Sequence, residues 1–349
     1  MRIAQLAPLT ESVPPRLYGG TERVVSFLTE QLVAMGHTVT LFASGDSRSS
    51  AELIAMWPHA LRLDPNVRDV FAPHVLMLEQ VCRRADEFDV IHSHLDYWPF
   101  SLFRRQSTPF ITTLHGRLDL PELGPLYNFF SDVPLVSVSD AQRLPLPQAN
   151  FVATVQHGLP EDLLTPRPVT PGYLAFLGRI SPEKRPDRAI HIARRAGIPL
   201  KIAAKVDRAD DTYFRDVIRP MIDGRNVELI GEITDAEKPD FLSGAIALLV
   251  PIDWPEPFGL VMIEAMACGT PVIAFNRGSV PEIVEPGVTG LIVEDETEAV
   301  AAIEQAAHLP RDMVRHRFEQ RFTAQRMAQN YLALYRRLVA RGRPLRVVG

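Results

Sequence analysis

The stretch that decides the fold spans residues 253–274 and reads DWPEPFGLVMIEAMACGTPVIA. An apolar run at Ala245–Val250 precedes it, and a second one at Pro271–Phe275 lies at its end. Between these runs a helical pattern extends from Gly259 to Ala267, and Gly269 follows in the position of a left-handed C-terminal residue. The order of strand, loop, short helix and strand predicts one βαβ unit of a parallel sheet.

The loop before this helix, Trp254–Gly259, contains two prolines and leads into the helix N-terminus. Free backbone N–H groups and the helix dipole at such an end favour an anionic or hydroxyl-rich ligand. Glu256 in the loop and Glu264 in the helix could accept hydrogen bonds from two sets of hydroxyls, such as those of a sugar and a ribose. Taken singly, the two glutamates are explained equally well as a turn residue and a solvated helix residue.

The complete string is more specific than its parts. It closely resembles the signature of the retaining glycosyltransferases of family 4 over Glu256-Pro257-Phe258-Gly259-Leu260 and Ile263–Val272. In that family two glutamates eight positions apart mark the nucleotide-sugar site. The resemblance implies that Glu256 binds the sugar hydroxyls, that Glu264 binds the ribose, and that Pro257, Phe258, Gly259 and Leu260 lie against the donor.

Length and composition set the broad class. A chain of 349 residues with 46% hydrophobic and 23% charged residues predicts a globular protein of two domains. The net charge of -5 argues against a general nucleic-acid binder. The two cysteines, Cys82 and Cys268, are far apart and have no metal-ligand spacing, which favours a reducing compartment.

The N-terminal residues Met1–Pro8 are too few and too polar for a signal peptide and are expected to form a first strand. No apolar run reaches the length of a membrane span. We therefore expect a cytoplasmic protein, with peripheral membrane contact left open.

The first half of the chain alternates predicted strands and helices. The expected helices are Thr21–Met35 and Arg68–Ala85, and residues 44–67 are expected to be irregular. The expected strands are Ile3–Ala7, His37–Ala43, Asp89–His94, Phe110–Gly116, Pro134–Val138 and Phe151–Val155.

The Gly19-Gly20 pair precedes the first helix, where the backbone must turn tightly or approach a ligand. By itself the pair is explained by a plain loop-to-helix turn, because the three-glycine fingerprint is absent. Tyr18-Gly19-Gly20-Thr21-Glu22 resembles the glycine-rich loop that packs against the donor phosphates in family 4.

Histidines end two of the predicted strands. His92 and His94 could face one side and bind a metal, but no third ligand is evident, so a strand end at the lip of a cleft is the better explanation. His115 lies at the carboxyl end of its strand, the edge where ligands bind in open α/β sheets. The Leu-His-Gly context resembles that of the family's donor-sugar histidine. Farther on, Ser139 could cap a helix, at a strand end that resembles the family's serine-rich one.

The segment 161–172 is rich in proline and has no helical period, which predicts a linker. Beyond it the alternation restarts, with strands expected at Tyr173–Leu177, Leu200–Ala204, Val227–Ile230, Ala245–Val250, Pro271–Ala274 and Gly290–Val293. The fold class is therefore α/β, and the resemblance implies two doubly wound Rossmann-like domains facing across a cleft, the GT-B architecture. We expect domains at 1–160 and 173–310, and a C-terminal helix at 311–349 that returns to the first domain.

A second motif follows the first strand of this half. Ser181 is a good N-cap and Pro182 a good first helical residue, which places Lys184 in the first turn and Arg179 at the strand end. Cations are unfavourable at a helix N-terminus unless an anion shares the site, although two solvated basic residues would also explain them. The segment resembles the family's basic pair on the donor diphosphate, except that Arg185 stands where many members have glycine.

Three further residues are expected near the donor. Lys205 follows a strand and could reach the same anion as Arg179. Gly231 and Ile233 follow another strand, at the place that resembles the family's nucleobase contact. That contact uses mainly backbone groups, so the sequence does not choose between a UDP-sugar and a GDP-sugar.

The C-terminal segment Arg311–Arg346 is helical in pattern and very basic. Its arginines are expected to form a solvated helix face, or alternatively to touch anionic lipid headgroups. They are Arg311, Arg315, Arg317, Arg321, Arg326, Arg336, Arg337, Arg341, Arg343 and Arg346.

The resemblance implies a retaining glycosyltransferase that moves a hexose from a nucleoside diphosphate sugar to an acceptor hydroxyl. Arg179, Lys184 and the helix N-terminus would stabilise the leaving diphosphate, with Glu256 and His115 at the sugar. Family 4 enzymes are generally discussed as front-face transferases in which the donor phosphate helps to deprotonate the acceptor, so no dedicated base is expected. No Asp-x-Asp motif occurs, so neither a metal nor another cofactor is expected.

Two alternatives stay open. A GT-B nucleotide-sugar 2-epimerase would bind the same class of ligand, but such sequences lack the Glu-Pro-Phe-Gly…Glu string. A catalytically silent nucleotide-sugar-binding subunit would not be expected to keep Arg179, Lys184, Glu256 and Glu264 together. The acceptor is contacted by the loops 44–67 and 117–132 in this prediction, and it could be a sugar, a lipid-linked sugar or a small metabolite.

Overall fold

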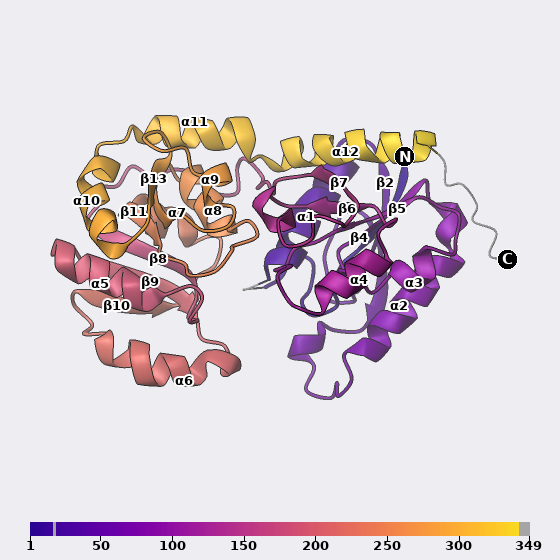
Figure 1. The fold of residues 1–349 in the computed structure, drawn as a ribbon, viewed down its shortest axis with the longest axis horizontal. Coiled ribbons are helices and arrows are strands. Elements are labelled where there is room, and N and C mark those ends of the chain that lie inside the picture. Colours follow the sequence, from indigo (N-terminus) through magenta and orange to yellow (C-terminus); the bar gives the residue numbers. More distant parts are fainter. Residues whose placement is uncertain (17–18, 342–349) are drawn as a thin grey trace. The chain divides into compact units, whose positions relative to one another are not determined.

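The computed structural model describes residues 1–16 and 19–341. Tyr18, Arg343 and Arg346 therefore lie outside the described residues. Contacts within the chain divide it into two compact units (Figure 1). The first unit contains residues 1–158 and the chain from Ala324 onward, and the second contains Leu159–Thr323.

In the described part of the first unit, seven parallel strands form one sheet in the order β3-β2-β1-β4-β5-β6-β7. Its elements are β1 (Arg2–Leu6), α1 (Gly20–Ala34), β2 (Thr38–Ser44), β3 (Glu52–Trp57), α2 (Phe71–Arg83), β4 (Val90–Ser93), α3 (Phe100–Phe103), β5 (Phe110–Thr113), α4 (Leu123–Phe129), β6 (Leu135–Ser137), β7 (Phe151–Thr154) and α12 (Ala324–Arg341).

The second unit has a six-stranded parallel sheet in the order β10-β9-β8-β11-β12-β13. Its elements are β8 (Tyr173–Arg179), α5 (Pro186–Ala196), β9 (Leu200–Lys205), α6 (Asp211–Tyr213), β10 (Val227–Gly231), α7 (Lys238–Ser243), β11 (Ala245–Val250), α8 (Leu260–Ala267), β12 (Val272–Phe275), α9 (Val280–Ile283), β13 (Gly290–Val293), α10 (Glu296–Ala307) and α11 (Arg311–Arg321).

The strands of both sheets have mostly apolar sequences because helices cover both faces of each sheet. In the second unit α5 and α10 pack against each other and against the sheet. Alternate strand residues such as Phe176, Leu249 and Ile273 join their apolar core. The apolar helix α8 packs against β11 and β12 and is covered by α11. The predicted α/β class with two doubly wound units is confirmed.

The last helix, α12, belongs to the first unit although it follows the second in sequence. It packs against α1 and β4 and is drawn in yellow beside the indigo N-terminal elements (Figure 1). Tyr331 and Tyr335 on this helix are fully buried. The hydroxyl groups of two buried tyrosines need hydrogen-bond partners, and the first sheet supplies them.

Four features differ from the sequence-based expectations. Residues 44–67 are not wholly irregular, because β3 forms within them. This strand pairs only with β2 at the sheet edge and exposes Glu52 and Ala55, so it lacks the buried pattern by which a strand is recognised. The C-terminal segment is two helices with a break at Phe322–Thr323, and α11 stays with the second unit.

The segment expected as a linker, residues 161–172, is also part of the second unit. Its backbone is held there by hydrogen bonds from Arg167 N to Ser243 Oγ and from Gly172 N to the Gly244 carbonyl. The fourth difference, the start of α5 at Pro186, bears on the site.

No helix in the described ranges 1–16 and 19–341 combines the length and apolarity needed to cross a membrane. Cys82 and Cys268 are unpaired, and burial raises the pKa of the Cys268 thiol to about 12.

Candidate functional site

Strand order places the predicted site residues at two comparable positions. Each sheet reverses its order once, between β1 and β4 in the first unit and between β8 and β11 in the second. Ligands of doubly wound folds bind beyond the carboxyl ends of the strands at such a reversal. Arg179 ends β8, Lys184 follows this strand and Glu256 follows β11, so the second unit brings these three to one sheet edge.

Lys184 and Glu256 form a direct ion pair, Nζ to Oε2. Trp254 completes the group, because its indole Nε1 donates to Glu256 at 2.9 Å and its ring lies 5.0 Å from the Lys184 nitrogen. Glu256 is only 8% exposed. Lys184, expected to bind an anion, and Glu256, expected to bind a sugar, are therefore paired with each other in this structure.

The two segments that carry this pair are joined by further contacts. The backbone N–H of Asp253 donates to the Glu183 carbonyl at 2.9 Å. The Asp253 carboxylate accepts from Arg185 at 3.2 Å and from Arg188 at 3.0 Å. The loop after β8 and the loop after β11 therefore behave as one assembly.

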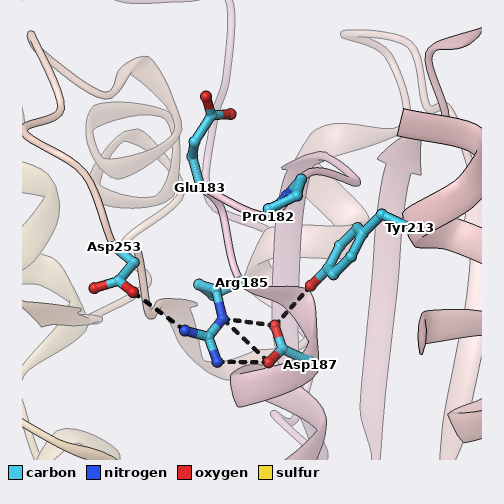
Figure 2. Close-up of a pocket in the computed structure, with 6 residues that line it drawn as sticks. All are labelled: Pro182, Glu183, Arg185, Asp187, Tyr213 and Asp253. Carbon is cyan, nitrogen blue, oxygen red and sulfur yellow. Dashed lines mark hydrogen bonds and ion pairs between the residues drawn. The ribbon is translucent and has the colours of Figure 1, made fainter. Parts of the chain in front are cut away.

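Figure 2 shows Arg185 at the centre of an open pocket of about 450 Å³ lined by Pro182, Glu183, Arg185, Asp187, Tyr213 and Asp253. Its guanidinium bonds Asp187 through Nε and Nη2, and Tyr213 donates to the same carboxylate at 2.7 Å. Burial alone would raise the pKa of Asp187, but the hydrogen bonds from Arg185 and Tyr213 outweigh it and lower that pKa.

The local backbone here corrects the expected helix start. Residues 181–184 form a turn in which the Ser181 carbonyl accepts from Lys184 N, and α5 begins at Pro186. Ser181 is therefore not the N-cap of α5, nor Pro182 its first residue. Pro186 disfavours the α region for the residue before it, and Arg185 adopts a left-handed conformation with φ 54° and ψ 53°.

Arg179 and Lys205 lie side by side because β8 pairs with β9 in that register. Lys205 contacts Asp207 at 3.0 Å, and Arg179 contacts Glu183 at 3.2 Å and Asp210 at 3.4 Å. The two cations are thus already matched by carboxylates. Charge balance alone therefore does not require a shared anion at Arg179 and Lys205.

The predicted start of α8 agrees with the structure to within one residue. Gly259 is its N-cap at φ 83°, and a Cβ there would lie 2.6 Å from the Met262 methyl carbon. Phe258 is buried and its carbonyl accepts from Ser279 Oγ at 2.7 Å. Among the described residues, the backbone N–H groups of Leu260 and Val261 have no protein partner, as expected in a first helical turn.

Support for Glu256 comes from a residue that the sequence analysis missed. Gly278 has φ +56°, and a Cβ there would overlap the backbone N and O of Glu256. The neighbouring Ser279 N donates to the Glu256 carbonyl at 2.9 Å. The chain after β12 therefore packs directly on the backbone of the Glu256 loop, which only glycine permits.

Glu264 is buried and paired with a second missed residue, Lys238, at 2.6 Å. Lys238 begins α7 and also contacts Asp235 at 3.1 Å. A lysine at a helix N-terminus opposes the helix dipole, so the argument used for Lys184 could have drawn attention to Lys238 as well. Glu264 resembles Glu256 in being held by a lysine.

The remaining expected donor residues lie at strand ends. Gly231 ends β10 with φ 89°, and Ile233 follows it half-buried. In the first unit Gly19 is the N-cap of α1 and packs on Pro15, where a Cβ would lie 2.8 Å from the Pro15 Cβ. Gly20 is the exposed first residue of that helix.

His115 belongs to the first unit, apart from the other expected catalytic residues in sequence and in unit. Gln142 holds the backbone on either side of it, because its amide donates to the Leu114 carbonyl at 3.0 Å and the Gly116 carbonyl at 2.8 Å. Ser139 accepts from Gln142 N at 3.1 Å, but the 3-10 turn that follows, Ala141–Arg143, has Asp140 as its N-cap, so Ser139 is not the expected cap. Within the described ranges, no three His, Cys, Asp or Glu side chains form a group suited to a metal ion.

Several arginines of the C-terminal segment correct the expectation of a solvated face. Arg311 binds the carbonyls of Ser243 and Ala245, and Arg315 binds those of Glu161, Leu164 and Ala267. Arg317 forms a bidentate pair with Glu285, and Arg321 donates to the Glu282 carbonyl. These side chains secure α11 to the second unit.

Comparison with known proteins gives a consistent result. A family model described as glycosyl transferases group 1 matches residues 165–324, and one described as glycosyltransferase family 4 matches residues 18–187. Phosphatidyl-myo-inositol mannosyltransferase of Mycobacterium leprae is 25% identical over 91% of this chain and 90% of its own length.

Two solved structures illustrate the shared fold. AviGT4, a glycosyltransferase involved in avilamycin A biosynthesis, has a TM-score of 0.75 at 25% identity and covers 97% of this chain and 98% of its own. Anabaena HepE in complex with UDP-glucose has a TM-score of 0.71 at 19% identity, with coverage of 97% and 100%.

The left-handed backbone of Arg185 makes a testable prediction. Arg185→Ala and Arg185→Gly both remove the contacts with Asp187 and Asp253, but only alanine keeps the unfavourable conformation. We expect Arg185→Gly to retain about 1 kcal/mol more unfolding free energy than Arg185→Ala in urea denaturation. The reverse order would mean that residue 185 is not left-handed in solution.

Proposed function

Because the chain belongs to the family 4 glycosyltransferases and has their GT-B fold, we propose that it is a retaining hexosyltransferase that uses a UDP- or GDP-sugar. The hexose moves to an acceptor hydroxyl without the help of a metal ion. The observation that carries this proposal is the Lys184–Glu256 ion pair beside the start of α8.

The pair suits a ligand with an anionic part and a hydroxyl-bearing part. A diphosphate offers Lys184 a stronger partner than one carboxylate, and the released Glu256 can then accept hydrogen bonds from sugar hydroxyls. Binding by exchange of partners leaves neither buried charge alone at any stage, which avoids the penalty of an unpaired charge. Trp254 keeps a hydrogen bond to Glu256 during the exchange and so limits its movement.

The same groups would stabilise the leaving diphosphate as its bond to the sugar breaks. Lys184 supplies one charge, and the open N–H groups of Leu260 and Val261 add the positive end of α8. Arg179 and Lys205 can exchange Asp207 and Asp210 for phosphate oxygens in the same manner. Preorganised charge of this kind is commonly the largest contribution to catalysis.

The other expected donor contacts are proposed from the family resemblance. In this proposal Glu264 binds the ribose, and Gly231 and Ile233 lie at the base. Gly19 and Gly20 approach the phosphates, and His115 binds a sugar hydroxyl. The relatives support a hexose donor in that HepE is solved with UDP-glucose and the Mycobacterium leprae relative is a mannosyltransferase.

The proposal is tested by the release of nucleoside diphosphate from a panel of UDP- and GDP-hexoses. We expect release from one donor, and at least a 100-fold lower rate in Lys184→Ala because one stabilising charge is lost. Lys201→Ala is the matched control, since Lys201 is in the same unit and contacts the Tyr173 ring instead. No release, together with no thermal stabilisation by UDP or GDP, would contradict the proposal.

Exchange of partners makes a separate prediction for Glu256. Glu256→Gln frees Lys184 from its carboxylate, so we expect nucleoside diphosphate to bind about 3- to 10-fold more tightly while turnover falls. Isothermal titration calorimetry measures the affinity without turnover. Weaker binding of the diphosphate would show that Glu256 does not compete with it for Lys184.

Metal independence and retention are measured on the same reaction. We expect the rate to be unchanged after treatment with EDTA, because lysine and arginine take the place of a cation at the diphosphate. Proton NMR of the first sugar product should show the anomeric configuration of the donor. A requirement for a divalent ion, or the inverted anomer, would refute the corresponding part of the proposal.

A further inference from the structure

A buried chain of hydrogen bonds in the first unit leads to His115. Its Nε2 lies 2.9 Å from His94 Nδ1, and His94 Nε2 lies 3.0 Å from the amide oxygen of Gln5. The Gln5 amide nitrogen donates to the Tyr335 hydroxyl at 3.2 Å. Gln5 and Tyr335 have no exposed surface, and His94 is 3% exposed.

The two imidazoles in this chain are uncharged. Burial lowers the pKa of His115 to about 3 and lowers that of His94 well below its usual value. A neutral imidazole has one N–H donor and one acceptor nitrogen, so each contact in the chain has a direction.

The direction follows from Gln5. Its amide oxygen can only accept, so His94 Nε2 carries the proton and His94 Nδ1 is an acceptor. His115 must then donate from Nε2 to His94, which leaves His115 Nδ1 with a lone pair.

The other end of the chain is consistent with this direction. The Tyr335 hydroxyl lies 2.7 Å from His92 Nδ1 and can donate to it while its oxygen accepts from Gln5. His92 Nε2 then donates to Thr113 Oγ1 at 2.7 Å, and Thr113 contacts Tyr331 at 2.9 Å. The network is satisfied with one proton at each contact.

His115 Nδ1 is open to a ligand. Its ring is partly exposed, and within the described residues Nδ1 has no hydrogen-bond partner and is not among the buried polar atoms that lack one. The ring is held by His157, which stacks on it at 5.2 Å, and by the Gln142 contacts to the adjoining backbone.

We propose that Gln5, His94 and Tyr335 are positioning residues that fix His115 as a neutral hydrogen-bond acceptor at Nδ1, directed to a hydroxyl of the bound sugar or acceptor. The identity of this ligand rests on the proposed function, whereas the protonation state does not. An acceptor nitrogen selects for a hydroxyl donor and against a phosphate oxygen. A nitrogen this weakly basic is also unsuited to proton transfer, so the role of His115 is recognition.

The protonation state is measured on the ligand-free protein labelled with ¹⁵N-histidine. Long-range ¹H–¹⁵N spectra distinguish protonated from unprotonated ring nitrogens, and His115→Gln assigns the signal. We expect one tautomer of His115, with the proton on Nε2, throughout the neutral pH range. A proton on Nδ1, a mixture of tautomers or a charged ring would overturn the proposal.

Two tyrosines of α12 provide matched variants. Tyr335→Phe removes the direct partner of Gln5. Tyr331→Phe makes the same change at an equally buried residue that is linked to Tyr335 only through Thr113 and His92. We expect mixed tautomers of His115 in Tyr335→Phe and in Gln5→Leu, and the single tautomer in Tyr331→Phe. A single Nε2–H tautomer in all three variants would mean that Gln5 and Tyr335 do not set it.

Binding experiments identify the hydroxyl. Gln5→Leu should bind the nucleotide sugar about 3- to 10-fold more weakly and the nucleoside diphosphate with unchanged affinity. Donor analogues in which one hydroxyl is replaced by hydrogen or by fluorine show which hydroxyl is involved. Neither substituent can donate a hydrogen bond, so both analogues should bind equally weakly at the position concerned. If every donor analogue binds with unchanged affinity and a deoxy acceptor binds more weakly, the contact is with the acceptor.

The outcomes separate the two proposals. If the protein binds no nucleotide but His115 carries its proton on Nε2, the proposed function is refuted and the positioning role of Gln5, His94 and Tyr335 stands. Normal nucleotide-sugar binding with an Nδ1–H tautomer would refute the positioning role alone. Equal weakening of nucleotide sugar and nucleoside diphosphate in Gln5→Leu would point to a general structural effect and overturn the recognition role.

Discussion

The parallel direction of all strands in each sheet is the constraint on which the site depends. It gathers the carboxyl ends of the strands at one edge and forces each connection to run back over a face. Where the strand order reverses, two loops leave neighbouring strands in opposite directions. The loops after β8 and β11 meet in this way, which is why Lys184 and Glu256 touch although they are 72 residues apart. His94 and His115 follow the neighbouring strands β4 and β5 and meet because the carboxyl ends of these parallel strands lie at one edge.

Charge pairing explains how the second unit remains stable with so many ionisable groups at one edge. Lys184, Lys238, Arg179 and Lys205 each contact at least one carboxylate. A buried charge without a partner is strongly unfavourable, whereas a pair that changes partners stays compensated. In the proposed function, an arriving diphosphate would replace these carboxylates one at a time. The contacts of Asp253 with Arg185 and Arg188 keep both loops in position while this happens.

The sequence predicted what depends on neighbouring residues. The unit β11–α8–β12, the left-handed Gly269 and the glutamates of α8 and its loop all follow from local periodicity, proline and glycine. The start of α5 was placed at Pro182 because Ser181-Pro182 is a good capping pair, but Pro186 carries the same signal and Arg185 cannot continue a helix before it. Strand β3 was missed because its short apolar run, ELIAMW, lacks polar alternation and lies within an otherwise polar segment.

Contacts between distant residues could not be predicted in this way. Lys238 and Glu264 are 26 residues apart, Gln5 and His94 are 89 apart, and Gln5 and Tyr335 are 330 apart. No local pattern connects such pairs, since their proximity arises only when the sheets and α12 are assembled. His115 was recognised from its strand end, but the residues that orient its ring were not.

The two units solve the problem of a buried polar site by different physical means. In the second unit the polar groups are charged and paired, so they can exchange partners with a charged ligand. In the first unit the ring centroid of His94 lies 4.1 Å from that of His92 and 5.1 Å from that of His115. Burial lowers the pKa of all three histidines. None of their hydrogen bonds in the described structure is to a carboxylate, so a proton added to one ring would be a charge without compensation. The cluster is therefore restricted to neutral tautomers, and a network of neutral donors and acceptors can favour a ligand only through the direction of its hydrogen bonds. That restriction makes the first unit suited to recognising hydroxyl groups, and it leaves the handling of negative charge to the second.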